Sequence, residues 1–237
     1  MRPLALDLFC GAGGASEGLR QAGFDVLGVD IRPQPRYPFH FIQADALSFL
    51  ETWIVPHEHF RLLGEARKIE FIWASPPCQK NTALRTMPNA RSHECLIEPT
   101  RALLKQIGPP WAMENVVGAP LINPVTLCGT SFGLSDPGGC LGHGPWELQR
   151  HRLVEARFPL PQLPCNHRVP CLGVYGGHVR DRRRREGSES RGRSDPPREL
   201  AENLMGIHWM TLDELSQSIP PAYSRWVAEQ WIAPSQK

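Results

Sequence analysis

Short apolar runs recur along the first half of the chain, and each is followed by a turn or by a polar segment. These runs are rich in β-branched and aromatic residues, so they predict buried strands. They cover residues 4–9, 25–30, 39–45, 71–75 and 111–116. Strands that alternate with helical segments predict an α/β fold with an open sheet, in which ligands gather at the carboxyl ends of the strands.

Segments with helical periodicity lie between and after these strands. Helices are predicted at residues 15–22, 46–68 with an interruption near Pro56, 96–107, 199–205 and 220–232. A short strand is expected at 125–129. An alternating strand is expected at 147–154, where Arg150 and Arg152 would point to one face and suit a carbonyl oxygen or a phosphate.

Composition is that of an ordinary globular protein, since 41% of the 237 residues are hydrophobic and 21% are charged. This length supports one core and a small appended lobe. The net charge of +2 neither requires nor excludes a nucleic-acid partner. No apolar run approaches the roughly 20 residues that span a bilayer, so no membrane segment is expected. Seven dispersed cysteines, and no apolar leader after Met1, predict a reducing cytoplasmic setting.

The composition changes between residues 158 and 198, where prolines are followed by a group of cysteines and histidines and then by eight arginines. The group is Cys165, His167, Cys171 and His178. Its spacing is not a familiar ligand pattern, so no metal site is predicted. The arginines suit phosphate contacts or a solvated linker, and both readings stay open. Three parts are therefore expected: a main domain at 1–157, a small separate region or linker at 158–198, and C-terminal helices at 199–237 that complete the main domain.

Candidate ligand-binding residues follow the first three strands. A glycine-rich turn at residues 10–14 joins the first strand to a helix, an arrangement that suits a nucleotide-like ligand but also an ordinary tight turn. Asp30 ends the second strand, where a carboxylate can accept hydrogen bonds from a ribose. Asp45 ends the third strand, where a carboxylate can accept from an exocyclic amine.

Candidate catalytic residues follow or lie within the next two strands. Cys78 comes directly after Pro76-Pro77, which must end the preceding strand. A thiol on so stiff a turn suits a nucleophile, although a small buried cysteine would look the same. Glu114 lies in the apolar strand 111–116, and burial of a carboxyl group there would favour its protonated form.

In order along the chain, these segments resemble the cytosine C5 methyltransferases, from Leu4 to the last helix with only 158–198 unmatched. The sequence from Asp7 to Gly14 resembles the family's first S-adenosylmethionine motif, and Pro77-Cys78-Gln79 its catalytic motif. Glu114-Asn115-Val116 and Arg150-His151-Arg152 resemble two later motifs. Two departures stand out, since Leu148 replaces a glutamine and residues 216–221 differ from the closing motif at most polar positions.

The resemblance implies a Rossmann-like class I fold with a small irregular target-recognition lobe and S-adenosylmethionine as cofactor. It implies a catalytic set of Cys78, Glu114, Arg152 and Arg150, with Cys78 adding to C6 of a flipped-out cytosine and residues 79–95 closing over it. Its implied cofactor-binding set is Phe9, Gly11, Ala12, Gly13, Gly14, Asp30, Ile31, Asp45, Ala46 and Pro76.

Double-stranded DNA is the expected partner, and a short or relaxed target sequence is expected. The enzyme is expected to be a monomer of the restriction-modification type, and its short length suggests an orphan or phage-type member. Transfer RNA stays open as the polymer, because one group within the resemblance acts on it. A nicotinamide-dependent oxidoreductase would leave Cys78 and Glu114 without roles. An amino-group methyltransferase normally has an aromatic residue where this chain has Cys78. A DNA-binding paralogue without activity is the remaining alternative.

Overall fold

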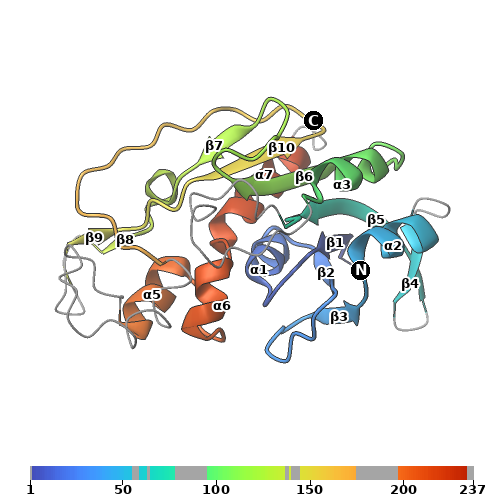
Figure 1. Cartoon of the computed structure of the whole chain (residues 1–237), viewed down its shortest axis with the longest axis horizontal. Coiled ribbons are helices and arrows are strands. Elements are labelled where there is room, and N and C mark those ends of the chain that lie inside the picture. The colour runs from blue at the N-terminus through green and yellow to red at the C-terminus, as the bar shows by residue number, and fades with distance from the viewer. Residues whose placement is uncertain are drawn as a thin grey trace.

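One twisted, mostly parallel sheet forms the centre of the molecule in the computed structural model (Figure 1). The structure describes residues 2–54, 59–62, 65–77, 95–136, 139, 145–174 and 197–233. Strands in the sheet follow the order β3-β2-β1-β5-β6-β10-β7, and β4 pairs with β5 outside this path. Neighbours from β3 to β6 are parallel, whereas β10 runs antiparallel to both β6 and β7. The predicted α/β fold is therefore confirmed.

The strands of the sheet are β1 (Leu4–Leu8), β2 (Asp25–Asp30), β3 (His40–Gln43), β4 (His59–Leu62), β5 (Glu65–Ala74), β6 (Trp111–Val116), β7 (Val125–Leu127) and β10 (Arg152–Ala156). A separate two-stranded sheet contains β8 (Ser135–Asp136) and β9 (Trp146–Glu147). The helices are α1 (Gly14–Gln21), α2 (Ala46–Phe49), η1 (Leu50–Ile54), α3 (Ile97–Leu104), η4 (Gly129–Phe132), α5 (Arg198–Met205), α6 (Leu212–Gln217) and α7 (Pro221–Ile232).

Side chains on opposite faces of the sheet build two separate cores, because successive residues of a strand point to opposite faces. One core joins Leu4, Leu6, Leu8 and Ile72 to Phe49, Ile97 and Leu104 of α2 and α3. The other joins Ala5, Phe71 and Trp73 to Leu19 of α1 and to Tyr223 and Val227 of α7. Helices thus cover both faces, and the end of the chain completes the core that its beginning starts.

A third apolar cluster lies beside this sandwich. Leu148 and Leu172 pack there with residues of α5 and α6, including Leu204 and Leu215. Leu148, which departs from the family motif, is 1% exposed in this cluster. Among the described residues, no helix is long and apolar enough to cross a membrane.

The expectation of helix over residues 46–68 was wrong for its second half. Helix ends at Ile54, and residues from His59 onward form the antiparallel pair of β4 with the first part of β5. Phe60 and Leu62 alternate with His59 and Arg61, a period of two that a helical reading overlooks. The extra pairing lengthens β5 well beyond the predicted apolar run.

The expected strand at 147–154 was also wrong. The chain is in β9 only to Glu147, and β10 begins at Arg152. Arg150 between them has a left-handed φ of 31°, which interrupts an extended strand. Helix α6 was not predicted, although Thr211 and Glu214 form a capping box that marks its start in the sequence.

Replacing Glu155 with Gln tests a buried ion pair that fixes α3 to β10. Both oxygens of Glu155 accept from Arg101, at 2.9 Å from Nε and 2.8 Å from Nη2, and both side chains are almost fully buried. Neutralising Glu155 leaves the buried Arg101 guanidinium with one carboxylate partner, the exposed Glu98, so we expect a loss of about 2 kcal/mol or more in the free energy of unfolding, measured by denaturant titration.

The matched control is Glu229→Gln, which breaks the exposed Arg225–Glu229 pair of α7. An exposed pair contributes about 1 kcal/mol or less, so this variant should unfold almost like the wild type. Equal losses of unfolding free energy in the two variants would show that the buried pair stabilises the fold no more than an exposed pair does.

Candidate active site

Ends of β1, β2, β5 and β6 meet at one edge of the sheet, and the candidate site is built there. The chain moves outward from β1 to β2 and β3 in one direction and from β5 to β6 in the other. Such a reversal of strand order leaves a crevice at the carboxyl ends of the strands, where open α/β sheets bind ligands. A cavity of about 270 Å³ occupies this edge.

The glycine-rich turn forms one wall of the cavity. Phe9, Gly11, Ala12 and Gly14 line it, and Gly13 precedes the first residue of α1. A Cβ atom on Gly14 would lie 1.9 Å from Ser218 Oγ and 2.5 Å from the Ile219 carbonyl oxygen. Only glycine lets the start of α1 come so close to the segment between α6 and α7, which also lines the cavity.

Asp30 organises the turn through its carboxylate. Its Oδ2 accepts from the backbone N–H of Gly11 at 2.9 Å, and its Oδ1 accepts from the N–H of Arg32 at 2.9 Å. Ile31, which follows Asp30 in the sequence, exposes 64% of its surface, and this is unusual for a large apolar side chain. Asp30 and Ile31 thus present a carboxylate and an apolar surface next to each other.

Asp45 and Ala46 lie at the end of β3 and the start of α2. The Asp45 side chain caps the helix, since it accepts from the N–H of Ser48 at 2.9 Å, and Ala46 is buried. Asp30, Ile31, Asp45 and Ala46 do not line the 270 Å³ cavity itself. The sequence therefore predicted residues on the same edge of the sheet, but not all of them on the cavity wall.

Glu114 brings a buried carboxyl group to the cavity. Its Oε1 lies 3.0 Å from Arg152 Nε, and the Ser75 hydroxyl also hydrogen bonds to it. Burial raises the pKa of Glu114, and the charge of Arg152 and the bond from Ser75 offset only part of this effect. Ser75 and Glu114 both line the cavity, so a group that can hold a proton faces it.

Arg150 does not share a face with Arg152. Its guanidinium donates to backbone carbonyls of Val174, Ser216 and Ser218, with the Ser216 bond at 2.8 Å. The positive φ of Arg150 turns its side chain toward this segment, whereas Arg152 faces Glu114. In this structure Arg150 therefore anchors the segment that closes the cavity.

The turn after β5 is fixed next to Glu114. Asn115 donates from Nδ2 to the Pro76 carbonyl oxygen at 2.8 Å, and the Leu96 N–H donates to the Pro77 carbonyl oxygen at 3.3 Å. Pro76 is buried and Pro77 is exposed. Cys78 and residues 79–94 of the expected closing loop lie outside the described residues.

Asp7 is a cavity residue that the sequence reading did not single out. It is fully buried in β1, and Ser16 donates a short hydrogen bond to its Oδ2. Burial raises the pKa of Asp7 to about 7. Its place inside the first motif, at an inward position of an apolar strand, could have marked it as a buried acid.

Two curated proteins match part of this chain in sequence. The Type II methyltransferase M.XorII of Xanthomonas oryzae pv. oryzae is 30% identical over 122 residues, which are 49% of this chain and 29% of that protein. The Type II methyltransferase M.AgeI of Thalassovita gelatinovora is 29% identical over 122 residues, 48% of this chain and 28% of that protein. The matched part thus spans less than a third of either relative, and no family model matches the chain.

Solved structures match almost the whole chain at low identity. A "putative DNA modification methyltransferase" encoded within an Escherichia coli prophage gives a TM-score of 0.59 at 14% identity, covering 99% of this chain and 100% of that one. Schizosaccharomyces pombe Dnmt2 gives 0.56 at 13% identity, covering 100% of both. Spodoptera frugiperda DNMT2 gives 0.51 at 14%, covering 96% and 98%.

These similarities confirm the fold class, and the sequence matches agree with the resemblance to methyltransferases that the motifs indicated. The chain has the Rossmann-like fold of the S-adenosylmethionine-dependent methyltransferases. It is related in sequence to Type II methyltransferases, and the cofactor that fold and relatives imply is S-adenosylmethionine.

Asp30→Asn tests the cofactor edge of the site. The substitution removes the charge that holds the glycine-rich turn, so we expect S-adenosylmethionine to bind about 10- to 100-fold more weakly, measured by titration calorimetry. The control is Asp25→Asn at the opposite end of β2, where the carboxylate pairs with Arg67 at 2.9 Å. Similar affinities for the Asp30 variant and the wild type would remove Asp30 from the cofactor site.

Asp7→Asn tests the buried acid through the pH dependence of stability. The folded pKa of Asp7 is about 7, above its ordinary 3.8, so its stabilising contribution is complete at low pH and is lost as pH rises through about 7. Between about pH 5 and pH 8 the wild type should therefore lose more thermal stability than the isosteric neutral variant. Parallel melting curves across this range would contradict the assignment.

Proposed function

We propose that this protein transfers a methyl group from S-adenosylmethionine to C5 of cytosine in DNA. The observation that carries the proposal is the contact between Glu114 and Arg152 beside the turn that leads to Cys78. Glu114 and Ser75 line the same cavity as the glycine-rich turn, so the proposed base site and cofactor site adjoin.

The reaction needs a carbon nucleophile at C5, which cytosine by itself does not provide. In the proposed mechanism the thiolate of Cys78 adds to C6, and electron density moves toward C5. Glu114, with its raised pKa, donates a hydrogen bond to N3 and also contacts the exocyclic amine. Arg152 binds the O2 oxygen, where negative charge develops. C5 would then take the methyl group, while the electrons of the methyl–sulfur bond leave on the sulfur of the cofactor. Loss of the C5 proton to solvent and elimination of the Cys78 thiolate then release the product.

S-adenosylmethionine supplies the methyl group as an electrophile. The chain's own residues fit its positively charged end, because Asp7 lines the cavity and its Oδ1 has no hydrogen-bond partner among the described residues. The turn from Phe9 to Gly14 would hold the methionine part, and Asp30 the ribose. Ile31 would cover the adenine ring, while Asp45 would accept from the adenine amine. Ala46 and Pro76 would complete the walls.

Double-stranded DNA is the proposed substrate, and the target cytosine must leave the stack to reach Glu114. Flipping a base costs a few kcal/mol, which contacts of the protein with phosphates and with the flipped base must offset. The proposed recognition region at 158–198 is small, so few base-edge contacts and a short or relaxed target sequence follow. Much of the affinity would then come from its arginines and fall with added salt.

Two further functions stay in competition. One is methylation of transfer RNA, because a cytosine in RNA would use the same site chemistry. The second competing function is methyl transfer to an exocyclic amino group of a base. It would leave Cys78 and the buried Glu114 without roles. The proposed enzyme is a monomer that needs no obligate protein partner and works in the cytoplasm.

Covalent trapping tests the proposal directly. The protein is incubated with S-adenosylmethionine and duplex DNA that contains 5-fluorocytosine, whose fluorine cannot leave as a proton. We expect a protein–DNA adduct that survives denaturation, is absent from Cys78→Ala, and persists in the matched control Cys171→Ala. Sequencing the trapped DNA gives the target sequence.

An adduct only with RNA that carries the same analogue would move the substrate to RNA. No adduct with either polymer, while calorimetry still shows cofactor binding, would overturn the C5 mechanism and favour amino-group transfer or binding alone. An adduct with Cys78→Ala would remove Cys78 as the nucleophile.

A further inference from the structure

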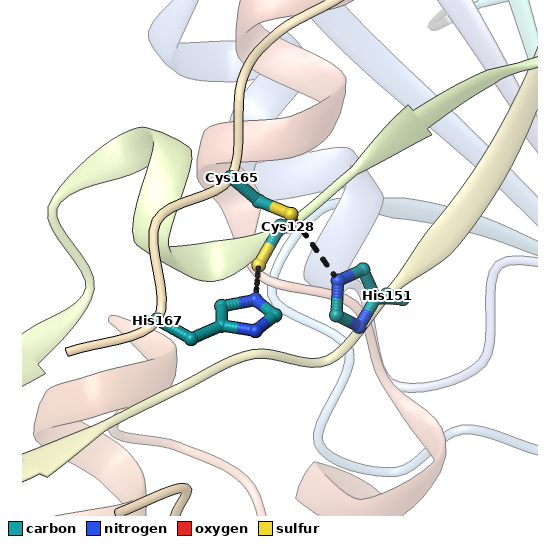
Figure 2. Close-up of side chains that lie close together, drawn as sticks. All are labelled: Cys128, His151, Cys165 and His167. Carbon is teal, nitrogen blue, oxygen red and sulfur yellow. Dashed lines mark hydrogen bonds between the residues drawn. The ribbon is translucent and has the colours of Figure 1, made fainter. Parts of the chain in front are cut away.

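Four metal-ligating side chains converge at a place outside the proposed active site. They are Cys128, His151, Cys165 and His167, and their ligand atoms all lie within 4.8 Å of one another (Figure 2). Cys128 follows β7, His151 precedes β10, and the other two belong to the extended chain after β10. The side chains point toward a common centre from three separate segments.

We propose that these four residues bind one zinc ion, which fastens residues 157–170 to the edge of the sheet. Two cysteines and two histidines form a ligand set that zinc prefers, and four such ligands close a structural site. With thiolates as ligands, the dipositive ion and the site carry no net charge, and binding releases the thiol protons.

The distances between ligand atoms suit a tetrahedral ion. Cys128 Sγ lies 3.4 Å from His167 Nε2, and Cys165 Sγ lies 3.7 Å from His151 Nε2. Zinc bonds of about 2.3 Å to sulfur and about 2.0–2.1 Å to nitrogen place tetrahedral ligands about 3.3–3.8 Å apart. These two separations already fall in this range, and the remaining pairs, which all lie within 4.8 Å, would have to close by about 1.5 Å at most.

Strand register explains why the first two ligands meet. In the antiparallel pair of β7 and β10, Leu127 lies opposite Arg152. One step further along the register, Cys128 comes opposite His151, and directly opposed residues of antiparallel strands have side chains on the same face. Beyond this pair the Gly129 N–H donates to the Gln149 carbonyl oxygen at 2.9 Å, one residue out of that register, because Arg150 with its positive φ interrupts the strand.

Hydroxyl groups of η4 hydrogen bond to the segment that carries the other two ligands, at residues next to them. Thr130 Oγ1 lies 3.1 Å from Cys128 Sγ and accepts from the Asn166 N–H at 3.3 Å, so it connects two ligand segments. Ser131 Oγ donates to the Pro164 carbonyl oxygen at 2.9 Å. Outer contacts of this kind orient metal ligands before the ion binds.

The segment that would be fastened is otherwise held by contacts near its two ends. Phe158 packs against Phe71 and Trp231, and the Glu147 carboxylate accepts from the N–H groups of Arg168 and Val169. None of residues 157–170 is buried, and the chain there runs as a long extended trace along β7 and β10 (Figure 1). A metal ion would add stability to a segment whose apolar side chains are only partly buried. His151 lies between Arg150 and Arg152, so the ion would also steady the start of β10.

Cys171 and His178 were grouped with Cys165 and His167 in the sequence. Cys171 lies in an isolated bridge with Glu147 and is not part of the cluster, and His178 lies outside the described residues. Cys171 and the exposed His208 therefore serve as matched controls for the two exposed ligands.

Metal analysis of the full chain tests the site without reference to methyl transfer. The protein is purified without chelators or a histidine tag, and zinc is measured by plasma mass spectrometry. We expect one zinc per chain in the wild type, Cys171→Ala and His208→Ala. In Cys165→Ala and His167→Ala the affinity should fall more than about 100-fold, measured by competition with a chromophoric chelator.

Cobalt substitution gives a second reading that needs no variant. Cobalt in the wild type should show the visible bands of a tetrahedral site and a thiolate charge-transfer band. Zinc removal should raise the rate of trypsin cleavage after the exposed Arg168 by about tenfold, because the ion no longer holds residues 157–170 against the sheet. Substoichiometric zinc, cobalt without these bands, or equal binding by ligand and control variants would overturn the proposal. A mass lower by one hydrogen pair, from a Cys128–Cys165 disulfide in protein kept reduced, would overturn it as well.

Discussion

A carboxyl group buried at the edge of the sheet places the strictest demand on this structure. Glu114 is 6% exposed, and burial of its charged form without partners would cost several kcal/mol. Arg152 meets that demand through the antiparallel β10, which brings its guanidinium 3.0 Å from the Glu114 carboxyl group. The site therefore depends on an antiparallel strand added beside the parallel part of the sheet.

Close contact between the two ends of the chain is the second requirement. Gly14 of α1 lies against the segment before α7, and Gly18 lies against α7 itself, so neither position has room for a side chain. Ser224 of α7 also donates to the Ala15 carbonyl oxygen at 2.7 Å. Arg150 holds the same C-terminal segment from the side of β10. Cavity walls that are far apart in sequence are thus fixed by backbone contacts, and Glu114 and the glycine-rich turn come to face one space.

Apolar strands and ordered motifs made much of this molecule predictable. β1, β2 and β6 were found because their runs are continuous, and Asp30 and Glu114 because an acid next to such a run is conspicuous. The hairpin of β4 with β5 was missed, since its alternation is short and polar. Arg150 was misplaced, because a positive φ at a residue other than glycine leaves no mark in a sequence. The cluster of Cys128, His151, Cys165 and His167 depends on register between strands, so no local spacing could have indicated it.

The position of the transferred methyl group tests the central claim most directly. Double-stranded DNA is incubated with the protein and with S-adenosylmethionine that carries a deuterated methyl group, and the DNA is then digested to nucleosides for mass spectrometry. The account predicts labelled 5-methylcytosine, absent when Cys78 is replaced by Ala. Label on N4-methylcytosine or N6-methyladenine would contradict it, because the buried Glu114 and the Cys78 that follows β5 in sequence would then have been assigned to the wrong chemistry.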